Sequence, residues 1–162
     1  MLDLVVERRL KIANHNLEEK LENEMVEFNG VDLAREEYYA LQKIAQKYGK
    51  GKTVEDYFDS HSDEDDVYLE IKDGHVIRLD MTGQDVKEIP SEVKKLKKLR
   101  LLYLGQNNIS QLRDLHLPHL EYIDLYNNKI TCEKNESIIS RLHEKGVGVI
   151  IESKETRKTE KY

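Results

Sequence analysis

The sequence predicts an α/β fold in which short repeats stack into a solenoid, their parallel strands forming one sheet after an N-terminal helical hairpin. The main observation is that stretches 76–89, 99–112 and 120–133 can be aligned, with starts 23 and 21 residues apart. This spacing is typical of solenoid repeats. A second observation is apolar residues at helical spacing before the repeats. Because a repeat array presents a surface, the fold class favours binding over catalysis.

The first expected element is a helix over residues 2–27, which contain no glycine or proline. Its apolar stripe has spacings of seven, four, four and three, and consists of Leu10, Leu17, Leu21, Met25 and Phe28. Asn29-Gly30 would end this helix, and Asp32 would cap a second one over 33–48. These two helices are expected to pack as a hairpin within an N-terminal helical region, residues 1–58.

The segment 59–66 has no apolar residue and is predicted to be an acidic, exposed loop. After it, apolar and polar residues alternate on both sides of Asp73-Gly74, which is a strong signal for a β-hairpin over 67–81. The second strand of this hairpin is also the first repeat strand. Its first strand would therefore pair with the exposed edge of the repeat sheet and cap it.

The remaining elements follow from the turns between apolar runs. Ser91 would cap a helical turn between the first two repeats. After the third repeat, a helix is expected over 135–145 and a strand over 147–151, which together would close the far end of the array. The repeat domain is thus predicted to span 67–151, with a polar tail over 152–162.

The last two repeats both read L-x-x-L-x-L-x-x-N-x-I; the matched positions are Leu99, Leu102, Leu104, Asn107 and Ile109, and then Leu120, Ile123, Leu125, Asn128 and Ile130. Residues 75–151 therefore resemble leucine-rich repeat proteins of the short intracellular type, and the segment from Asp66 resembles bacterial and archaeal members. The resemblance implies a curved array that binds other proteins on its concave strands. The N-terminal helices resemble no family that we can name.

The candidate binding residues follow from the strand alternation. The leucines of L-x-x-L-x-L point inward, so the residues between them, and the one after the third leucine, point to the concave side. These residues are Arg78, Asp80, Thr82, Leu101, Tyr103, Gly105, Tyr122, Asp124 and Tyr126. All of them except Thr82 and Gly105 form the set of seven predicted binding residues. Aromatic and arginine side chains are common interface anchors. Tyrosines also fit a pleated surface for structural reasons alone, which is the alternative interpretation.

Asn107 and Asn128 are interpreted as a structural ladder, because their amides can bond buried backbone groups between turns. Gln84 occupies the equivalent position in the first repeat, so that repeat is expected to be a degenerate terminal one. His116 and His119 lack a second ligand pair at zinc spacing, and Cys132 is expected to pack in the core. No metal, cofactor or catalytic residue is predicted.

Charge and hydropathy narrow the possible partners. The net charge is −6, and residues 1–75 carry 10 basic and 19 acidic side chains, so we expect no nucleic-acid partner. The basic run at Lys94–Arg100 is interpreted as a solvated outer face, with an acidic partner or membrane surface as the alternative.

The chain lacks an apolar run of the roughly 18 residues that span a membrane, and its charged start does not read as a signal peptide. With one cysteine, it is predicted to be cytoplasmic.

The sequence therefore predicts a non-enzymatic module that binds another protein through its concave face. The alternative is a scaffold protein that forms a homo-oligomer through the amphipathic helix within residues 1–28. In that case the repeats would only cap the helix. Neither the partner nor its pathway follows from the sequence.

Overall fold

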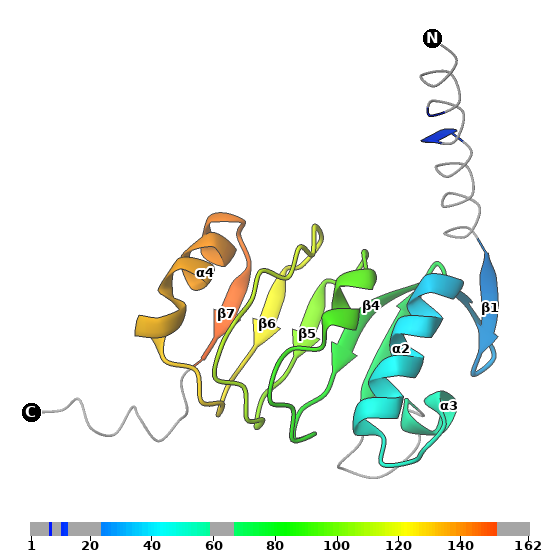
Figure 1. The fold of residues 1–162 in the computed structure, drawn as a ribbon, viewed down its shortest axis with the longest axis horizontal. Coiled ribbons are helices and arrows are strands. Elements are labelled where there is room, and N and C mark those ends of the chain that lie inside the picture. The colour runs from blue at the N-terminus through cyan, green and yellow to red at the C-terminus, as the bar shows by residue number, and fades with distance from the viewer. Residues whose placement is uncertain (1–6, 8–10, 13–23, 59–66, 152–162) are drawn as a thin grey trace, which may run out of the picture.

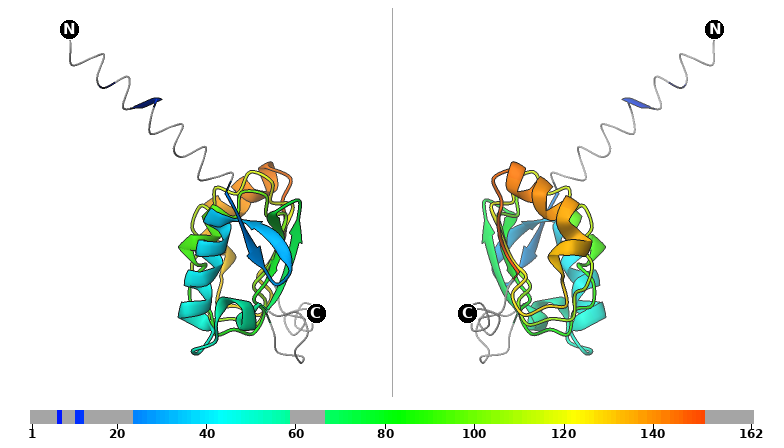
Figure 2. Two further views of the ribbon diagram at one scale, coloured as in Figure 1. Left: turned by 90° about the vertical axis from the view of Figure 1, so that its right-hand side faces the viewer. Right: turned by 90° about the vertical axis from the view of Figure 1, so that its left-hand side faces the viewer.

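The structure, a computed structural model, describes residues 7, 11–12, 24–58 and 67–151. Its main feature is a five-stranded sheet with the strand order β3-β4-β5-β6-β7. Figure 1 shows β4 to β7 side by side, with helices α2 and α3 at one end of the row and α4 at the other. The two views of Figure 2 place the sheet along one side of the molecule and α2 and α4 along the opposite side.

The three repeats each contribute one parallel strand, and these are β4 (His75–Asp80), β5 (Leu101–Tyr103) and β6 (Tyr122–Asp124). Leu79 pairs with Leu102, which in turn pairs with Ile123, and all three side chains are fully buried. These are the residues that the repeat alignment equates. The repeat register read from the sequence is thus the register of the sheet.

The chain returns between strands on the side opposite the sheet. The first return contains a short 3-10 helix, η1 (Ser91–Lys95), which buries Val93. Its N-cap residue is Pro90 and no side chain caps it, so the predicted serine cap is wrong; the Ser91 hydroxyl instead donates to the Glu92 carboxylate. The second return has no helix and buries three leucines, Leu112, Leu115 and Leu117.

Both ends of the sheet are formed as the sequence patterns indicate. β3 (Tyr68–Lys72) pairs antiparallel with β4 across the Asp73-Gly74 turn. At the other end, α4 (Cys132–Glu144) leads through Gly146 into β7 (Gly148–Ile150), which pairs parallel with β6. The helix begins three residues earlier than predicted, with Thr131 as its N-cap residue.

The N-terminal helical hairpin is not what the structure contains. β1 (Met25–Phe28) and β2 (Val31–Ala34) form an antiparallel hairpin, and the helix α2 (Arg35–Tyr48) starts only after it. Asn29 and Gly30 both have positive φ angles, of 46° and 81°, which is the conformation that a tight β-hairpin turn requires. Asp32 therefore lies in a strand and caps no helix.

The predicted helix over residues 2–27 lies almost entirely outside the described residues, and the proposal that it drives oligomerisation lies there too. Its last residues are corrected: Met25–Phe28 is a strand. Buried Phe28 and Leu33 alternate with exposed Glu27 and Asp32, as in a strand with one face on the core. Among the described residues, no helix is both long and apolar enough to cross a membrane.

The N-terminal elements share one hydrophobic core with the repeats. Leu33 from β2 and Leu41 and Ile44 from α2 belong to the same buried cluster as Leu79 and Leu102. The short helix α3 (Val54–Tyr57), capped by the Thr53 hydroxyl, adds its own apolar side chains to this cluster. The described part of the chain before the repeats is therefore continuous with them.

A buried carboxylate also connects α2 to the first repeat. Glu37 is 3% exposed, and its Oε2 accepts a hydrogen bond of 2.7 Å from the Val76 backbone N–H. Its Oε1 lies 2.9 Å from Nδ1 of His75. Burial raises the pKa of Glu37, although the bonds from Val76 and His75 oppose this shift. The carboxylate therefore satisfies a backbone group of β4 at an electrostatic cost.

We predict different effects for two substitutions of this residue. Glu37→Ala leaves the buried Val76 N–H without an acceptor and should lower the free energy of unfolding by about 2–3 kcal/mol. Glu37→Gln keeps an acceptor oxygen and should cost about 1 kcal/mol or less. Urea unfolding measures both changes, and an alanine variant as stable as the glutamine variant would contradict the role given to this bond.

The wild type and Glu37→Gln together test the buried charge. Because the pKa of Glu37 is raised above its ordinary value of 4.5 in the folded chain, the folded state retains this proton longer than the unfolded state does. Stability should then fall as the pH rises from 4.5 through the raised pKa. Glu37→Gln lacks this loss, so it should gain on the wild type across that window. If the difference in free energy of unfolding between the two proteins does not change with pH, the raised pKa of Glu37 is contradicted.

Candidate functional site

The candidate site is the open face of the sheet, meaning the side chains of β3 to β7 that project away from the core. The strand register arranges them in two rows. One row contains Arg78, Leu101 and Tyr122, and the other contains Asp80, Tyr103 and Asp124. All six are partly exposed, whereas the residues between them are buried. The structure therefore brings together six of the seven predicted binding residues on one surface.

Tyr126, the seventh, follows β6 and is also partly exposed. Its backbone N–H donates to the Asp124 carboxylate at 2.8 Å, which places the start of this turn next to the open face. Thr82 holds the equivalent position after β4. Gly105, after β5, is buried, and a Cβ there would lie 3.6 Å from Oδ2 of Asp124.

On this surface, the cation of Arg78 on β4 is stacked between two aromatic rings. The guanidinium carbon of Arg78 is 4.8 Å from the ring centroid of Tyr68 and 4.5 Å from that of Tyr103. These distances are typical of cation–π contacts. The Arg78 Nε is buried and has no hydrogen-bond partner. Its Nη2 lies 3.4 Å from Oδ2 of Asp80.

The aromatic contacts continue across the two rows from Tyr103 to Tyr122, whose ring centroids are 5.5 Å apart in a tilted arrangement. Beyond Tyr122, the paired residue on β7 is Gly148. A Cβ at Gly148 would lie 3.2 Å from Cδ2 of Tyr122, so the tyrosine ring covers the glycine. Burial, followed by the charge of Asp124, raises the pKa of Tyr122. Its hydroxyl therefore remains protonated and able to donate.

The sequence-based set lacks several residues of the open face: Tyr68, Ile150 and Glu70, which pairs with Arg78. Tyr68 on β3 pairs with Asp80, and Ile150 on β7 pairs with Asp124; they are 39% and 43% exposed. The alternation around Asp73-Gly74 contained the signal for Tyr68, since it fixes which residues of β3 face outward. Ile150 required the register of β7, which the repeat pattern does not extend to.

Asn107 and Asn128 bind backbone groups of two neighbouring turns each. The side-chain N–H2 of Asn107 donates to the carbonyls of Met81, Leu104 and Gly105, and its oxygen accepts from the Val86 N–H at 2.9 Å.

Asn128 repeats this pattern one turn further along. It donates to Leu104, Leu125 and Tyr126 and accepts from the Ile109 N–H at 2.9 Å. Both asparagines therefore connect successive repeats.

A third asparagine, which the sequence pattern did not single out, continues this series from α4. Asn135 is 2% exposed, and its oxygen accepts from the Leu112 N–H at 2.7 Å while its amide donates to the Thr131 carbonyl. In the first repeat, Gln84 donates to the Thr82 carbonyl and accepts from the Tyr57 hydroxyl, each at 3.4 Å. The longer side chain thus contacts α3, where a repeat asparagine would contact a preceding turn.

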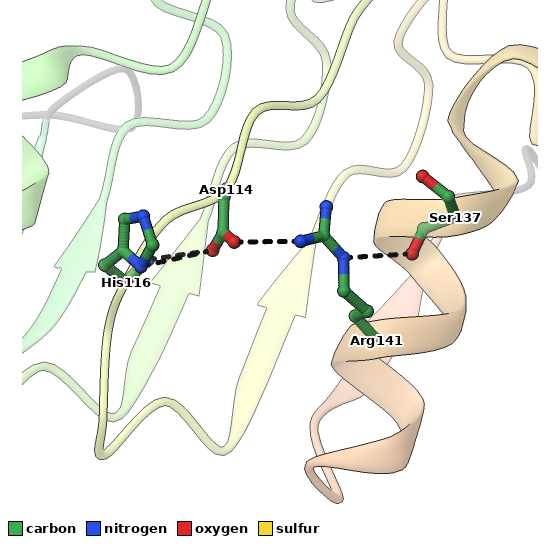
Figure 3. Close-up of polar contacts among 4 residues, drawn as sticks. All are labelled: Asp114, His116, Ser137 and Arg141. Atoms are coloured by element: carbon green, nitrogen blue, oxygen red, sulfur yellow. Dashed lines mark hydrogen bonds and ion pairs between the residues drawn. The ribbon is translucent and has the colours of Figure 1, made fainter.

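An ionic cluster on the opposite side involves one of the histidines considered as a metal ligand. Figure 3 shows the Asp114 carboxylate between His116 and Arg141, with Arg141 Nη1 3.1 Å from Oδ2 of Asp114. Arg141 Nε donates to the backbone carbonyl of Ser137, so the serine hydroxyl takes no part. The backbone N–H of His116 contributes most to the lowered pKa of Asp114. The geometry is that of a surface ion pair between a loop and α4.

Within the described residues, no group of three or more histidine, cysteine, aspartate or glutamate side chains could hold a metal ion. The start of the basic run, Lys94 and Lys95, lies in η1 on the side away from the open face, where Lys95 forms an ion pair with Glu36 of α2. Cys132 starts α4, and its side chain lies outside what the structure describes.

A polar hollow of about 720 Å³ adjoins the Asp80 end of the open face. It is lined by the end of α2, by Tyr57 of α3 and by the turn at Thr82–Asp85. Burial raises the pKa of Tyr57, so its hydroxyl stays protonated. The Thr82 hydroxyl donates to the Asp80 carboxylate at 2.7 Å.

Comparison with known proteins identifies part of this architecture. Residues 97–136 match a family described as Leucine Rich repeats (2 copies). The match covers the second and third repeats, with β5 and β6, and the start of α4. Searches of curated proteins and of solved structures gave no match. The first repeat lies outside the matched range, and its assignment depends on the strand register.

We predict that the asparagines carry much of the stability of the stack. Asn107→Ala should lower the free energy of unfolding by about 3 kcal/mol, because it removes the acceptor of the buried Val86 N–H and the donor to the Met81 carbonyl. Asn128→Ala should cost less, about 1–2 kcal/mol, because this residue is only partly buried. Ser110→Ala, an exposed change in the same region, serves as the control in urea unfolding. Equal losses in all three variants would contradict the ladder.

Proposed function

We propose that this leucine-rich repeat protein binds another protein through the open face of its sheet, the side that the sequence predicts to be concave. Leucine-rich repeat domains generally mediate protein–protein interactions and are typically non-enzymatic. The supporting observation is the set of large side chains left partly exposed on this face, in particular Leu101, Tyr103 and Tyr122. Such aromatic and aliphatic groups gain free energy when a partner covers them.

The arrangement of these side chains also favours binding. Arg78, Tyr103 and Tyr122 contact each other through stacked and tilted rings, so their conformations are already restricted in the free protein. These side chains would therefore lose little conformational entropy when a partner binds. The buried residues between them, such as Leu102, fix the strands that carry them. The proposed mechanism is surface complementarity on a preorganised face.

Partner capture with a face variant tests this proposal. The triple variant Tyr103→Ala, Tyr122→Ala, Tyr126→Ala lacks these tyrosine rings. It should bind the captured partner roughly tenfold more weakly or worse, because hot-spot side chains dominate an interface. Tyr39→Ala is the matched control: Tyr39 is 52% exposed but lies on α2, away from the sheet. Quantitative pull-down from native extract compares the three proteins, and thermal unfolding checks that each is folded.

A second variant, Leu101→Glu, tests the same face without removing the tyrosine rings, in case the triple variant does not fold. Leu101→Glu places a charge on the open face and leaves all three rings in place, so it should also reduce partner binding. If the partner binds the triple variant, Leu101→Glu and Tyr39→Ala equally well, the open face is not the binding site.

A further inference from the structure

Two aspartates occupy equivalent positions on the open face, and they differ in what surrounds their carboxylates. Asp80 ends β4 and Asp124 ends β6, with Tyr103 between them in the same row. In each case Oδ1 accepts the backbone N–H two residues later, from Thr82 at 3.1 Å and from Tyr126 at 2.8 Å. The two carboxylates are therefore held in the same way by their own turns.

Asp80 has a cation within the chain. Its Oδ2 lies 3.4 Å from Nη2 of Arg78, whose guanidinium group is stacked between the rings of Tyr68 and Tyr103. The Thr82 hydroxyl adds a further bond to Oδ1. Asp80 thus belongs to a complete arrangement of a carboxylate, an arginine and two aromatic rings, supplied by β3, β4 and β5.

Asp124 has the rings without the cation. Tyr122 occupies the position two residues before it, which Arg78 occupies relative to Asp80, and Tyr103 lies opposite it on β5. Its Oδ2 lies next to Gly105 and, within the part of the chain that the structure describes, has no hydrogen-bond donor or cation. The proximity of this charge contributes to the raised pKa of Tyr122.

The arginines near this face are already engaged. Arg78 is paired with Asp80, and Arg100 forms two bonds of 2.7 and 2.9 Å with the carboxylate of Glu121. A cation for Asp124 would therefore come from outside the described residues.

We propose that Asp124, with Tyr103 and Tyr122, binds an arginine side chain from a basic segment of the partner protein. The guanidinium group would donate to Oδ2 of Asp124 and lie against Tyr103 and Tyr122, whose rings contact each other and leave no room between them, unlike Tyr68 and Tyr103 around Arg78. This inference rests on the proposed function, since it names the chemistry of the partner that binds the open face. Arginine fits better than lysine because its planar group both stacks and donates in one plane.

A titration with small probes tests the site without the partner. N-acetyl-arginine amide is added to the full chain while the backbone amide signals are followed by NMR. The neutral isostere N-acetyl-citrulline amide is the control probe. We expect saturable shifts centred on Tyr126 and Gly105 with the arginine probe, and binding roughly tenfold weaker with citrulline, the effect of losing one charge-assisted bond.

Two variants with the same charge change locate the effect. Asp124→Asn keeps an oxygen that can accept the Tyr126 N–H, so it should fold normally and bind the arginine probe roughly tenfold more weakly. Glu136→Gln removes an exposed carboxylate on α4 and should bind like the wild type. Equal binding of both probes, or an undiminished response in Asp124→Asn, would overturn the inference.

The captured partner separates this inference from the proposed function. If the triple tyrosine variant loses the partner but Asp124→Asn retains it at wild-type affinity, the open face binds and the arginine site is wrong. If the triple variant retains the partner, the proposed function is wrong, and so is the partner role of Asp124 even where the arginine probe binds. Loss of the partner in both variants, with Glu136→Gln unaffected, supports both.

Discussion

The stack depends on the buried asparagine amides that bond the backbone of neighbouring turns. The second return between strands contains no helix, so its N–H and C=O groups cannot be satisfied within a regular element. Asn107 and Asn128 each accept one N–H from the turn before and donate to carbonyls of two repeats. These bonds fix the distance between repeats. The strands can then pair in register, and Leu79, Leu102 and Ile123 meet in the core.

At each end of the stack, a backbone N–H group also requires an acceptor, and a side chain of a flanking helix supplies it. At the far end, Asn135 of α4 accepts the Leu112 N–H, as the repeat asparagines do for earlier turns. At the near end, the Glu37 carboxylate of α2 accepts the Val76 N–H. Both side chains are almost fully buried. The flanking helices therefore supply polar groups as well as apolar cover, which explains why one hydrophobic core runs through them and the repeats.

Sequence patterns predict the repeat strands because the leucines that define the repeat are also the residues that the sheet buries. They fail before the repeats, where Met25 and Phe28 fit a helical stripe and Phe28 and Leu33 also fit a strand alternation. The turn at Asn29-Gly30 decides between the two, since positive φ at both residues suits a hairpin. Asn135 and Glu37 could not be predicted, because their role depends on where the helices dock. The tyrosines of the open face followed from the period of two, but the stacking of Arg78 between rings required the paired register of β3.

Polar groups in the core have hydrogen-bond partners within the protein, whereas one on the open face does not. The first arrangement serves stability and the second is suited to binding. In the core, Asn107 has a partner for each of its polar atoms, as the low dielectric requires. On the open face, Asp80 is completed by Arg78, whereas the equivalent Asp124 retains an oxygen beside Gly105. The position that Arg78 occupies beside Asp80 is taken by Tyr122 beside Asp124. The tyrosine leaves a negative charge beside stacked rings, and this combination is suited to a cation that arrives with a partner.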